Sequence, residues 1–214
     1  MMNKWLLCSV VFFPFVVSAL GQARDSVFAG IDDPVVLPML KTLYGKPVHW
    51  NVPPEDGRFL YDLVLRKGYK RGLELGTSNG YSTLWLGLAF RKNGGKITTI
   101  EIDRGRAAEA RENFRKAGLS NVIDSRLNDA FAEIPKMEGT FDFVFIDAGK
   151  GDYKRFLDLL YPRVTAGGVI TAHNVLDLGS EMPDFLDAVQ TNPNLKTTIE
   201  KTSQAGISVS FKKK

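Results

Sequence analysis

The sequence predicts an α/β fold of the doubly wound type, in which helices cover both faces of a sheet. Three observations carry this prediction. Strand-like and helix-like segments alternate from Arg71 to the C-terminus, and a turn with two glycines at residues 76–80 lies between a strand and a helix. Residues 141–146 form a nearly continuous apolar run, which is typical of a parallel strand buried on both faces.

Local patterns place the elements in chain order. Residues 31–67 are expected to form two helices, and prolines with acidic residues at 53–56 suit the start of the second. Further helices are expected at 81–91, 104–117, 153–164 and 181–190, and strands at 71–75, 96–101, 122–126, 141–146, 169–172, 195–200 and 207–211. No internal repeat or low-complexity linker interrupts this order, so residues 24–214 are expected to form a single domain.

Composition narrows the class of function. The chain has 214 residues and a net charge of +4, to which the terminal lysines 212–214 contribute. No long basic stripe with interleaved aromatic residues is present, so nucleic acid is not an expected partner. The single cysteine, Cys8, excludes an internal disulfide, and one cysteine with two histidines excludes a cysteine-rich or histidine-cluster metal site.

Residues 1–23 have the layout of a signal peptide or an N-terminal anchor. Lys4 precedes an apolar run, and small residues follow, with cleavage expected after Ala19 or Ala23. The run is short for a membrane span, which needs about 20 apolar residues. The chain is therefore expected to enter the export or secretory pathway and to be periplasmic, secreted or membrane-anchored, with the choice between cleavage and anchoring left open.

The turn after the first strand of the sheet has the features of a nucleotide-binding loop. Gly76 permits a tight turn, Gly80 is expected to let the backbone approach a ligand, and Glu101 ends the next strand at the interval where a carboxylate meets ribose hydroxyls. The glycines are spaced G-x-x-x-G rather than G-x-G-x-x-G, which disfavours a nicotinamide dehydrogenase. The alternative is a tight connection without a ligand.

Three segments carry a resemblance to a known family. Residues 74–82 read Glu-Leu-Gly-Thr-Ser-Asn-Gly-Tyr-Ser, residues 54–60 read Pro-Glu-Asp-Gly-Arg-Phe-Leu, and residues 141–150 read Phe-Asp-Phe-Val-Phe-Ile-Asp-Ala-Gly-Lys. Together they resemble the class I S-adenosylmethionine-dependent O-methyltransferases of the catechol and caffeoyl-CoA type, from about residue 51 to the C-terminus. The resemblance implies a Rossmann-like, mostly parallel sheet with an antiparallel C-terminal strand, S-adenosylmethionine as cofactor, and a homodimer as the assembly often found in the family.

The resemblance also implies which residues hold the cofactor. These would be Glu74, Gly76 and Ser82 around the methionine portion, Glu101 at the ribose, Asp129 and Ala130 at the adenine, and Asp147. For Asp129 the alternative is a helix N-cap before Phe131.

A second group of candidates follows two neighbouring strands. Asp147 ends a strongly apolar strand, where packing explains a carboxylate poorly, and His173 and Asn174 end the next strand. Strand ends of a parallel sheet share one edge, so these side chains should face one cleft. A divalent metal there would chelate neighbouring hydroxyls of an acceptor and lower the pKa of the attacking one. The alternatives are a turn or cap for Asp147 and a structural histidine for His173.

Lys150 lies three residues after Asp147 and, by the resemblance, would steer the acceptor or take its proton. The alternative is an ordinary exposed lysine. The sequence departs from the family at His173-Asn174, where Asp-Asn is usual. A set of carboxylate, imidazole and amide favours Mn²⁺, Fe²⁺ or Zn²⁺ over Mg²⁺. Alternatively no metal binds and His173 is the general base.

The leading hypothesis is O-methylation of a small acceptor with vicinal hydroxyls. A second hypothesis is a non-catalytic or sensing domain that binds S-adenosylmethionine. The N-terminal segment adds a membrane as a further expected partner.

Overall fold

The computed structural model describes residues 26–44 and 50–214. The chain divides into two compact units, residues 1–31 and 32–214. In the first unit, described residues 26–31 form turns, and the predicted signal peptide or anchor at 1–23 lies outside the described residues. No helix within the described ranges is long and apolar enough to cross a membrane.

The second unit is built on a seven-stranded sheet with the order β3-β2-β1-β4-β5-β7-β6. The strands are β1 (Arg71–Leu75), β2 (Lys96–Glu101), β3 (Ile123–Leu127), β4 (Phe141–Ile146), β5 (Val164–His173), β6 (Leu195–Glu200) and β7 (Ile207–Lys212). The first five run parallel, and β7 is antiparallel to both β5 and β6. The predicted mostly parallel sheet with an antiparallel C-terminal strand is confirmed.

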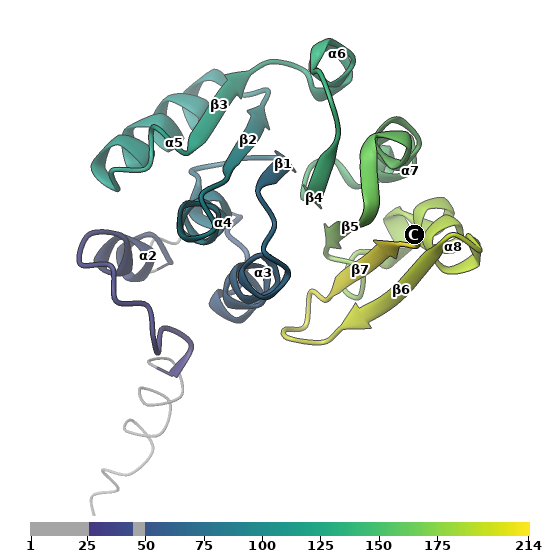
Figure 1. The fold of residues 1–214 in the computed structure, drawn as a ribbon, viewed down its shortest axis with the longest axis horizontal. Helices are drawn as coiled ribbons and strands as arrows, with labels where there is room; N and C mark the ends of the chain where they lie inside the picture. The colour runs from purple at the N-terminus through teal and green to yellow at the C-terminus, as the bar shows by residue number, and fades with distance from the viewer. Residues whose placement is uncertain (1–25, 45–49) are drawn as a thin grey trace, which may run out of the picture. The chain divides into compact units, whose positions relative to one another are not determined.

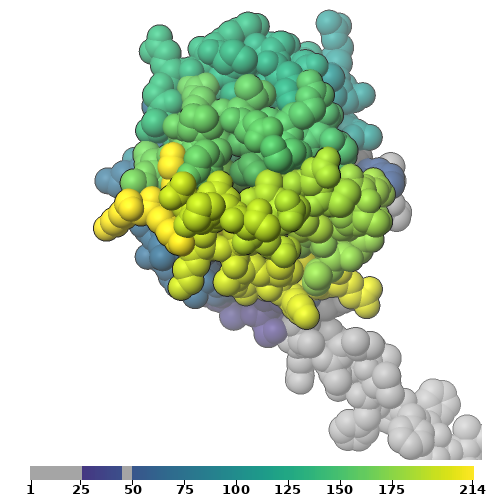
Figure 2. Space-filling model, turned by 90° about the vertical axis from the view of Figure 1, so that its right-hand side faces the viewer, coloured from purple at the N-terminus to yellow at the C-terminus, as the bar shows by residue number. Residues whose placement is uncertain are grey.

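Helices cover both faces of the sheet, as predicted. Helices α3 (Pro54–Lys67), α4 (Tyr81–Lys92) and α5 (Arg104–Lys116) lie on one face, and α6 (Ala130–Glu133), α7 (Tyr153–Leu160) and α8 (Pro183–Thr191) lie on the other (Figure 1). Helix α2 (Val36–Tyr44) packs against α4. Figure 2 shows a side of the protein formed largely by the later, green to yellow segments of the chain.

Most predicted boundaries lie within two residues of those in the structure, and two differ by more. The helix expected at 153–164 ends at Leu160, because Pro162 lacks an amide hydrogen and restricts the residue before it, so that Tyr161–Arg163 form a short 3-10 helix. Strand β5 then starts at Val164, five residues before the expected start at residue 169. The pairing of β4 with β5 shifts register between Phe141 and Phe143 and so accommodates the extra residues.

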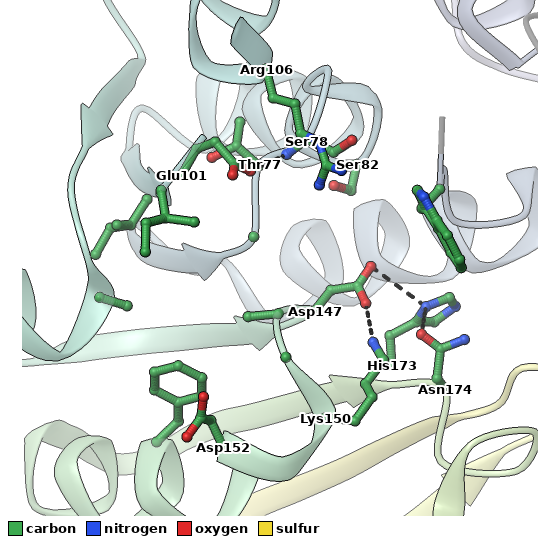
Figure 3. Close-up of a pocket in the computed structure, with 18 of the residues that line it drawn as sticks. Thr77, Ser78, Ser82, Glu101, Arg106, Asp147, Lys150, Asp152, His173 and Asn174 are labelled. Carbon is green, nitrogen blue, oxygen red and sulfur yellow. Dashed lines mark hydrogen bonds and ion pairs between the residues drawn. The ribbon is translucent and has the colours of Figure 1, made fainter. Parts of the chain in front are cut away.

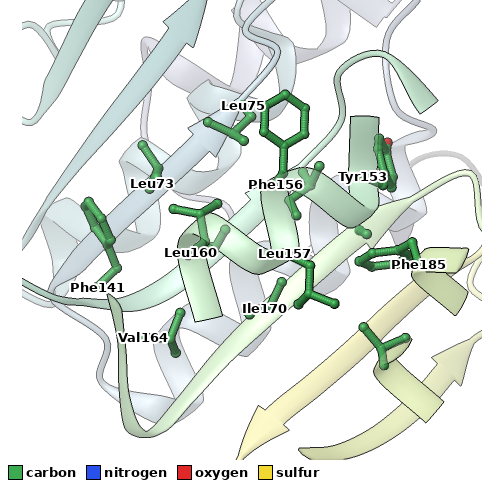
Figure 4. Close-up of a cluster of buried hydrophobic side chains, with 14 of the residues drawn as sticks. Leu73, Leu75, Phe141, Tyr153, Phe156, Leu157, Leu160, Val164, Ile170 and Phe185 are labelled. Atoms are coloured by element: carbon green, nitrogen blue, oxygen red, sulfur yellow. The ribbon is translucent and has the colours of Figure 1, made fainter. Parts of the chain in front are cut away.

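The core between the sheet and helices α7 and α8 holds the strands in place (Figure 4). Tyr153, Phe156, Leu157 and Leu160 of α7 recur at helical spacing and are buried. They pack against inward-facing residues of β1, β4 and β5, among them Leu73, Leu75, Val144, Ile146 and Ile170.

The strand order places the site. Strands β1 and β4 are neighbours in the sheet, but the chain leaves them in opposite directions, toward β2 and toward β5. Ligands of doubly wound folds bind beyond the carboxyl ends of the strands at such a reversal. The segments that follow β1, β2, β4 and β5 are therefore brought to one edge.

Candidate cofactor and catalytic site

The turn after β1 is tight and needs glycine at its first position. Gly76 has φ +90°, and its amide donates to the carbonyl of Ile100 at 3.0 Å. A Cβ atom at this position would lie 2.2 Å from the backbone oxygen of Asp147. The close approach of β1 and β4 at their carboxyl ends therefore depends on Gly76, which also lines the cavity described below.

Gly80 serves a purpose that differs from the predicted one. It also has a positive φ, +87°, but a Cβ atom there would lie 2.5 Å from the ring of Phe114 on α5. Gly80 does not line the cavity. The missing side chain makes room for a neighbouring helix, so the placement does not support the predicted approach to a ligand.

Glu101 faces the cavity from the end of β2, as predicted. Its carboxylate accepts hydrogen bonds from the amides of Ser78, at 2.8 Å, and Asp103, at 2.9 Å. The side chain is almost buried and lines the cavity. Since a carboxylate has about four acceptor sites, acceptors remain for two hydroxyl groups of a ligand.

Glu74 lies behind the glycine turn and does not line the cavity. It is fully buried and accepts hydrogen bonds from the hydroxyls of Ser82 (2.7 Å), Thr83 (2.5 Å) and Thr99 (2.6 Å). Burial raises the pKa of Glu74 to about 7, although these hydroxyls act in the opposite direction. The placement does not support the predicted contact with the cofactor: Glu74 fixes Ser82, and Ser82 lines the cavity.

Two polar atoms that the sequence did not single out point to a ligand. Oγ of Ser78 and Oδ1 of Asn51 are buried and have no hydrogen-bond partner within the described part of the chain, and both residues belong to the wall of the cavity. Ser78 also has a positive φ, +50°, which is uncommon for a residue other than glycine. Buried polar groups are normally satisfied, so these two atoms fit a bound polar ligand.

Asp129 and Ala130 line the cavity on the side of β3. Oδ1 of Asp129 accepts from the amide of Phe131 at 2.7 Å and so caps helix α6. The helix-cap interpretation of Asp129 is therefore confirmed. Because Asp129 also lies in the cavity wall, its predicted position beside the adenine stays a prediction that agrees with the cap. Phe131 stacks on Phe156 with ring centroids 4.4 Å apart, which adds an aromatic surface to this wall.

Asp147 and Lys150 form a pair across the cavity from Glu101 (Figure 3). Nζ of Lys150 lies 2.7 Å from Oδ1 of Asp147 and 2.8 Å from the hydroxyl of Tyr153. Burial acts to raise the pKa of Asp147, but His173 and Lys150 outweigh it and hold this pKa below its usual value. Lys150 is thus a fixed, largely buried cation at the cavity rather than an ordinary exposed lysine.

His173 and Asn174 reach the same cavity from the end of β5, as predicted. Nδ1 of His173 lies 3.1 Å from Oδ1 of Asn174 and 3.6 Å from Oδ2 of Asp147. Asn174 has φ +61°, and its Nδ2 donates to Asp177 at 3.1 Å, which directs the amide oxygen toward the ring. The strand ends therefore bring together the four side chains that the sequence grouped.

A residue that the sequence analysis missed completes the cluster. Nε2 of His173 lies 2.8 Å from Oδ2 of Asp56, which belongs to the first turn of α3 and is fully buried. The sequence carried one signal for it, because Asp56 lies on the same helix face as the buried residues Leu60 and Leu63. A carboxylate on an apolar face requires a partner.

This arrangement does not fit the predicted metal site. Each ring nitrogen of His173 faces acceptor oxygens, so each carries a proton and no lone pair is available for a cation. Burial acts to lower the pKa of His173, but Asp147 and Asp56 raise it to about 9. The described residues contain no group of three or more acidic, histidine or cysteine side chains arranged to hold a metal. The same contacts speak against His173 as a general base.

One cavity of about 960 Å³ is lined by Ser78, Ser82, Glu101, Asp129, Phe131, Asp147, Lys150, His173 and Asn174, whereas Glu74, Asp56 and Tyr153 lie behind its wall. Glu101, Ser78 and Ser82 face it from the β1 and β2 side, and Asp147, Lys150 and His173 from the β4 and β5 side (Figure 3). Trp50, a residue that is 85% exposed, lies at its wall. The volume matches a site for small ligands.

Comparisons with known proteins agree with this geometry. Residues 32–201 match the family described as O-methyltransferase. A catechol O-methyltransferase of Niastella koreensis is 36% identical over 147 residues, which are 67% of this chain and 64% of the relative. A caffeoyl-CoA O-methyltransferase of Populus kitakamiensis is 33% identical over 160 residues, 69% of this chain and 68% of the relative. The chain thus spans about two thirds of the length of these relatives.

Solved structures agree over nearly the whole chain. An O-methyltransferase from Bacillus cereus in complex with SAH superposes with a TM-score of 0.77 at 27% identity, covering 91% of this chain and 97% of that one. TomG from Streptomyces achromogenes, in complex with SAM, has a TM-score of 0.78 at 21% identity, covering 92% of this chain and 96% of that one, and shows the shared fold alone.

Proposed function

Because the chain belongs to the O-methyltransferase family, we propose that it transfers a methyl group from S-adenosylmethionine to a hydroxyl of a small, catechol-like acceptor. The observation that carries this proposal is a single cavity with two differently equipped sides. One side has acceptors for a ribose and unpartnered polar atoms, and the other has a fixed lysine–carboxylate pair.

The cofactor side fits S-adenosylmethionine. Glu101 would hold the ribose hydroxyls, and Ser78, Asn51 and Ser82 would hold the polar groups of the methionine portion. Gly76 would keep the backbone close, and Asp129, Ala130 and Phe131 would border the adenine. When bound, the cofactor supplies an activated methyl group on a sulfonium centre. The catechol and caffeoyl-CoA enzymes named above support a hydroxylated aromatic acceptor.

The protein's task is then to position the acceptor and remove its proton. Lys150 would orient the acceptor hydroxyl and, after releasing its own proton to solvent, would accept the hydroxyl proton on its neutral amine, while Asp147 and Tyr153 keep the amine at the cavity. Asp147 is held in turn by His173. The cation-assisted form of the reaction would need His173 as a ligand, and its two occupied nitrogens argue against that form.

A cofactor-binding titration and a methyl-transfer assay test the proposal together. We expect S-adenosylhomocysteine to bind in calorimetry and labelled methyl groups to pass from S-adenosylmethionine to members of a catechol panel. Binding without transfer to any diol would contradict the enzyme and favour the sensing domain. Absence of binding would contradict both.

We further propose that residues 1–23 direct the chain to the export pathway or anchor it in a membrane. N-terminal sequencing of purified protein distinguishes the two forms, because an intact Met1 would contradict cleavage. A homodimer, the assembly implied by the family resemblance, is tested by light scattering after gel filtration.

A further inference from the structure

The imidazole of His173 is held between two carboxylates that come from distant parts of the chain. Asp56, 117 residues earlier, lies 2.8 Å from Nε2, and Asp147 lies 3.6 Å from Nδ1. The His173 side chain is 5% exposed and that of Asp56 is fully buried. The ring therefore joins helix α3 to the end of β4 at the wall of the cavity.

Asp56 cannot turn away from the ring, because three donors hold it. Its Oδ1 accepts from the hydroxyl of Thr202, and its Oδ2 accepts from Ser203 at 2.7 Å and from His173. Both hydroxyl residues lie in the loop between β6 and β7. The carboxylate is thus fixed by the C-terminal hairpin and, through the ring, fixes the strand end of β5.

The charges of the cluster are already balanced. Asp56 and Asp147 bring two negative charges, and the doubly donating imidazole and Lys150 bring two positive ones. A buried carboxylate needs such a partner, and a divalent cation between Asp147 and Asn174 would supply positive charge at the place where the ring supplies it. In this protein Nδ1 of His173 lies beside Asp147 and Asn174, and it carries a proton. A cation at that place would instead need a nitrogen with a free lone pair as its ligand.

We propose that His173, fixed by Asp56, takes the structural place of a divalent cation and holds Asp147 in position, so that methyl transfer at this site proceeds without a metal ion. Asp56 is accordingly a positioning residue that acts through His173. The inference rests on the proposed methyl transfer, but its central claim about metal binding is measured without turnover.

Titration with Mn²⁺ followed by electron paramagnetic resonance tests the claim on metal binding. In the wild-type protein we expect the resonance signal of free Mn²⁺ to keep its full amplitude. In His173→Asp, which restores a carboxylate beside Asn174, we expect the signal to fall as an ion is bound, and a further Asp147→Asn change should abolish this binding. Mn²⁺ binding by the wild type that is lost in Asp147→Asn would overturn the proposal, whether or not His173→Asp folds.

Kinetics test the positioning role of Asp56. In Asp56→Asn we expect kcat to fall roughly tenfold to a hundredfold, as for other groups that orient a site residue, with the affinity for S-adenosylhomocysteine unchanged. Glu55→Gln is the matched control, because Glu55 is the preceding residue and exposed. Equal kcat in Asp56→Asn and Glu55→Gln would overturn the role, as would wild-type activity that chelation abolishes and Mn²⁺ restores.

A spectroscopic signature separates positioning from general stability. The chain has two histidines, so ¹⁵N-histidine labelling gives two sets of imidazole resonances in the NMR spectrum. The set that is missing in His173→Gln belongs to His173. We expect an exchange-protected Nε2–H resonance of His173 that disappears in Asp56→Asn and weakens in the milder Ser203→Ala variant. Its persistence in Asp56→Asn would contradict the hydrogen bond. If neither variant folds, the Mn²⁺ titration of the wild type decides alone.

Discussion

The backbone oxygen of Asp147 lies where a side chain on Gly76 would have to be, with only 2.2 Å to an ideal Cβ atom. The residue that opens the turn after β1 and the residue that pairs its carboxylate with Lys150 are therefore in direct backbone contact. We expect Gly76→Ala to lose stability through its positive φ, by about 1–2 kcal/mol, and through this clash, by roughly 1–3 kcal/mol more.

Gly118→Ala is the matched control for that prediction. Gly118 has a similar φ, +65°, and open space where the Cβ atom would stand, so it should lose only the conformational part. Urea unfolding of both variants measures the difference, and equal losses would show that the contact with Asp147 costs nothing.

Lys150→Met should slow methyl transfer strongly and leave cofactor binding unchanged. The substitution removes the amine that we propose to orient the acceptor and to accept its proton, and such groups typically contribute about 10²–10⁴-fold to the rate. We expect kcat to fall within this range and the affinity for S-adenosylhomocysteine to stay the same. Lys154→Met, which removes an exposed lysine of the next turn paired with Asp158, should leave kcat unchanged.

Glu101→Gln should weaken cofactor binding. The substitution keeps the shape of the side chain but removes the charge that accepts from the Ser78 and Asp103 amides and, as proposed, from the ribose. Hydrogen bonds to a charged group contribute about 1.5–3 kcal/mol, so the Kd for S-adenosylhomocysteine should rise roughly tenfold or more. Calorimetry measures this change, with the exposed Glu138→Gln as control, and an unchanged Kd would remove Glu101 from the ribose site.

Glu74→Gln should change how stability depends on pH. Burial raises the pKa of Glu74 in the folded protein to about 7, above its value of 4.5 in the unfolded chain. The folded state thus binds the proton more tightly, so this contribution to stability is complete below pH 4.5 and is lost as the pH rises through 7. Relative to Glu74→Gln, the free energy of unfolding of the wild type should fall by up to about 3 kcal/mol as the pH rises from 4.5 through 7. Urea unfolding at pH 5 and pH 8 measures the loss, and parallel pH profiles would contradict the raised pKa.

The sequence predicted the elements whose patterns are local. The alternation of strands and helices, the carboxylates at the ends of β2 and β4, and the histidine at the end of β5 all follow from residues close together in the chain. Its errors concern partners that are far away. Position 80 requires glycine, but the cause is the ring of Phe114, which lies on helix α5.

The same limit applies to His173 and Asp56. The sequence placed His173 at the cleft but could not show that a carboxylate of α3 already occupies its second nitrogen. Asp56 was read as part of an acidic helix start, which its position in the first turn also satisfies. Periodicity that sets it beside Leu60 and Leu63 is the one local sign of its burial.

The contacts of Asp56 with Thr202 and Ser203 join residues 146 and 147 positions apart. During synthesis the ribosome releases helix α3 and the glycine turn long before it releases this loop. Until then Asp56 lacks its hydroxyl donors, and a buried carboxylate without them is costly. A nascent chain arrested before β6 therefore carries every cofactor residue proposed above but lacks the two hydroxyl groups that fix Asp56. We therefore expect the cofactor side of the cavity to form before the side with Asp147, Lys150 and His173 as the chain is synthesised.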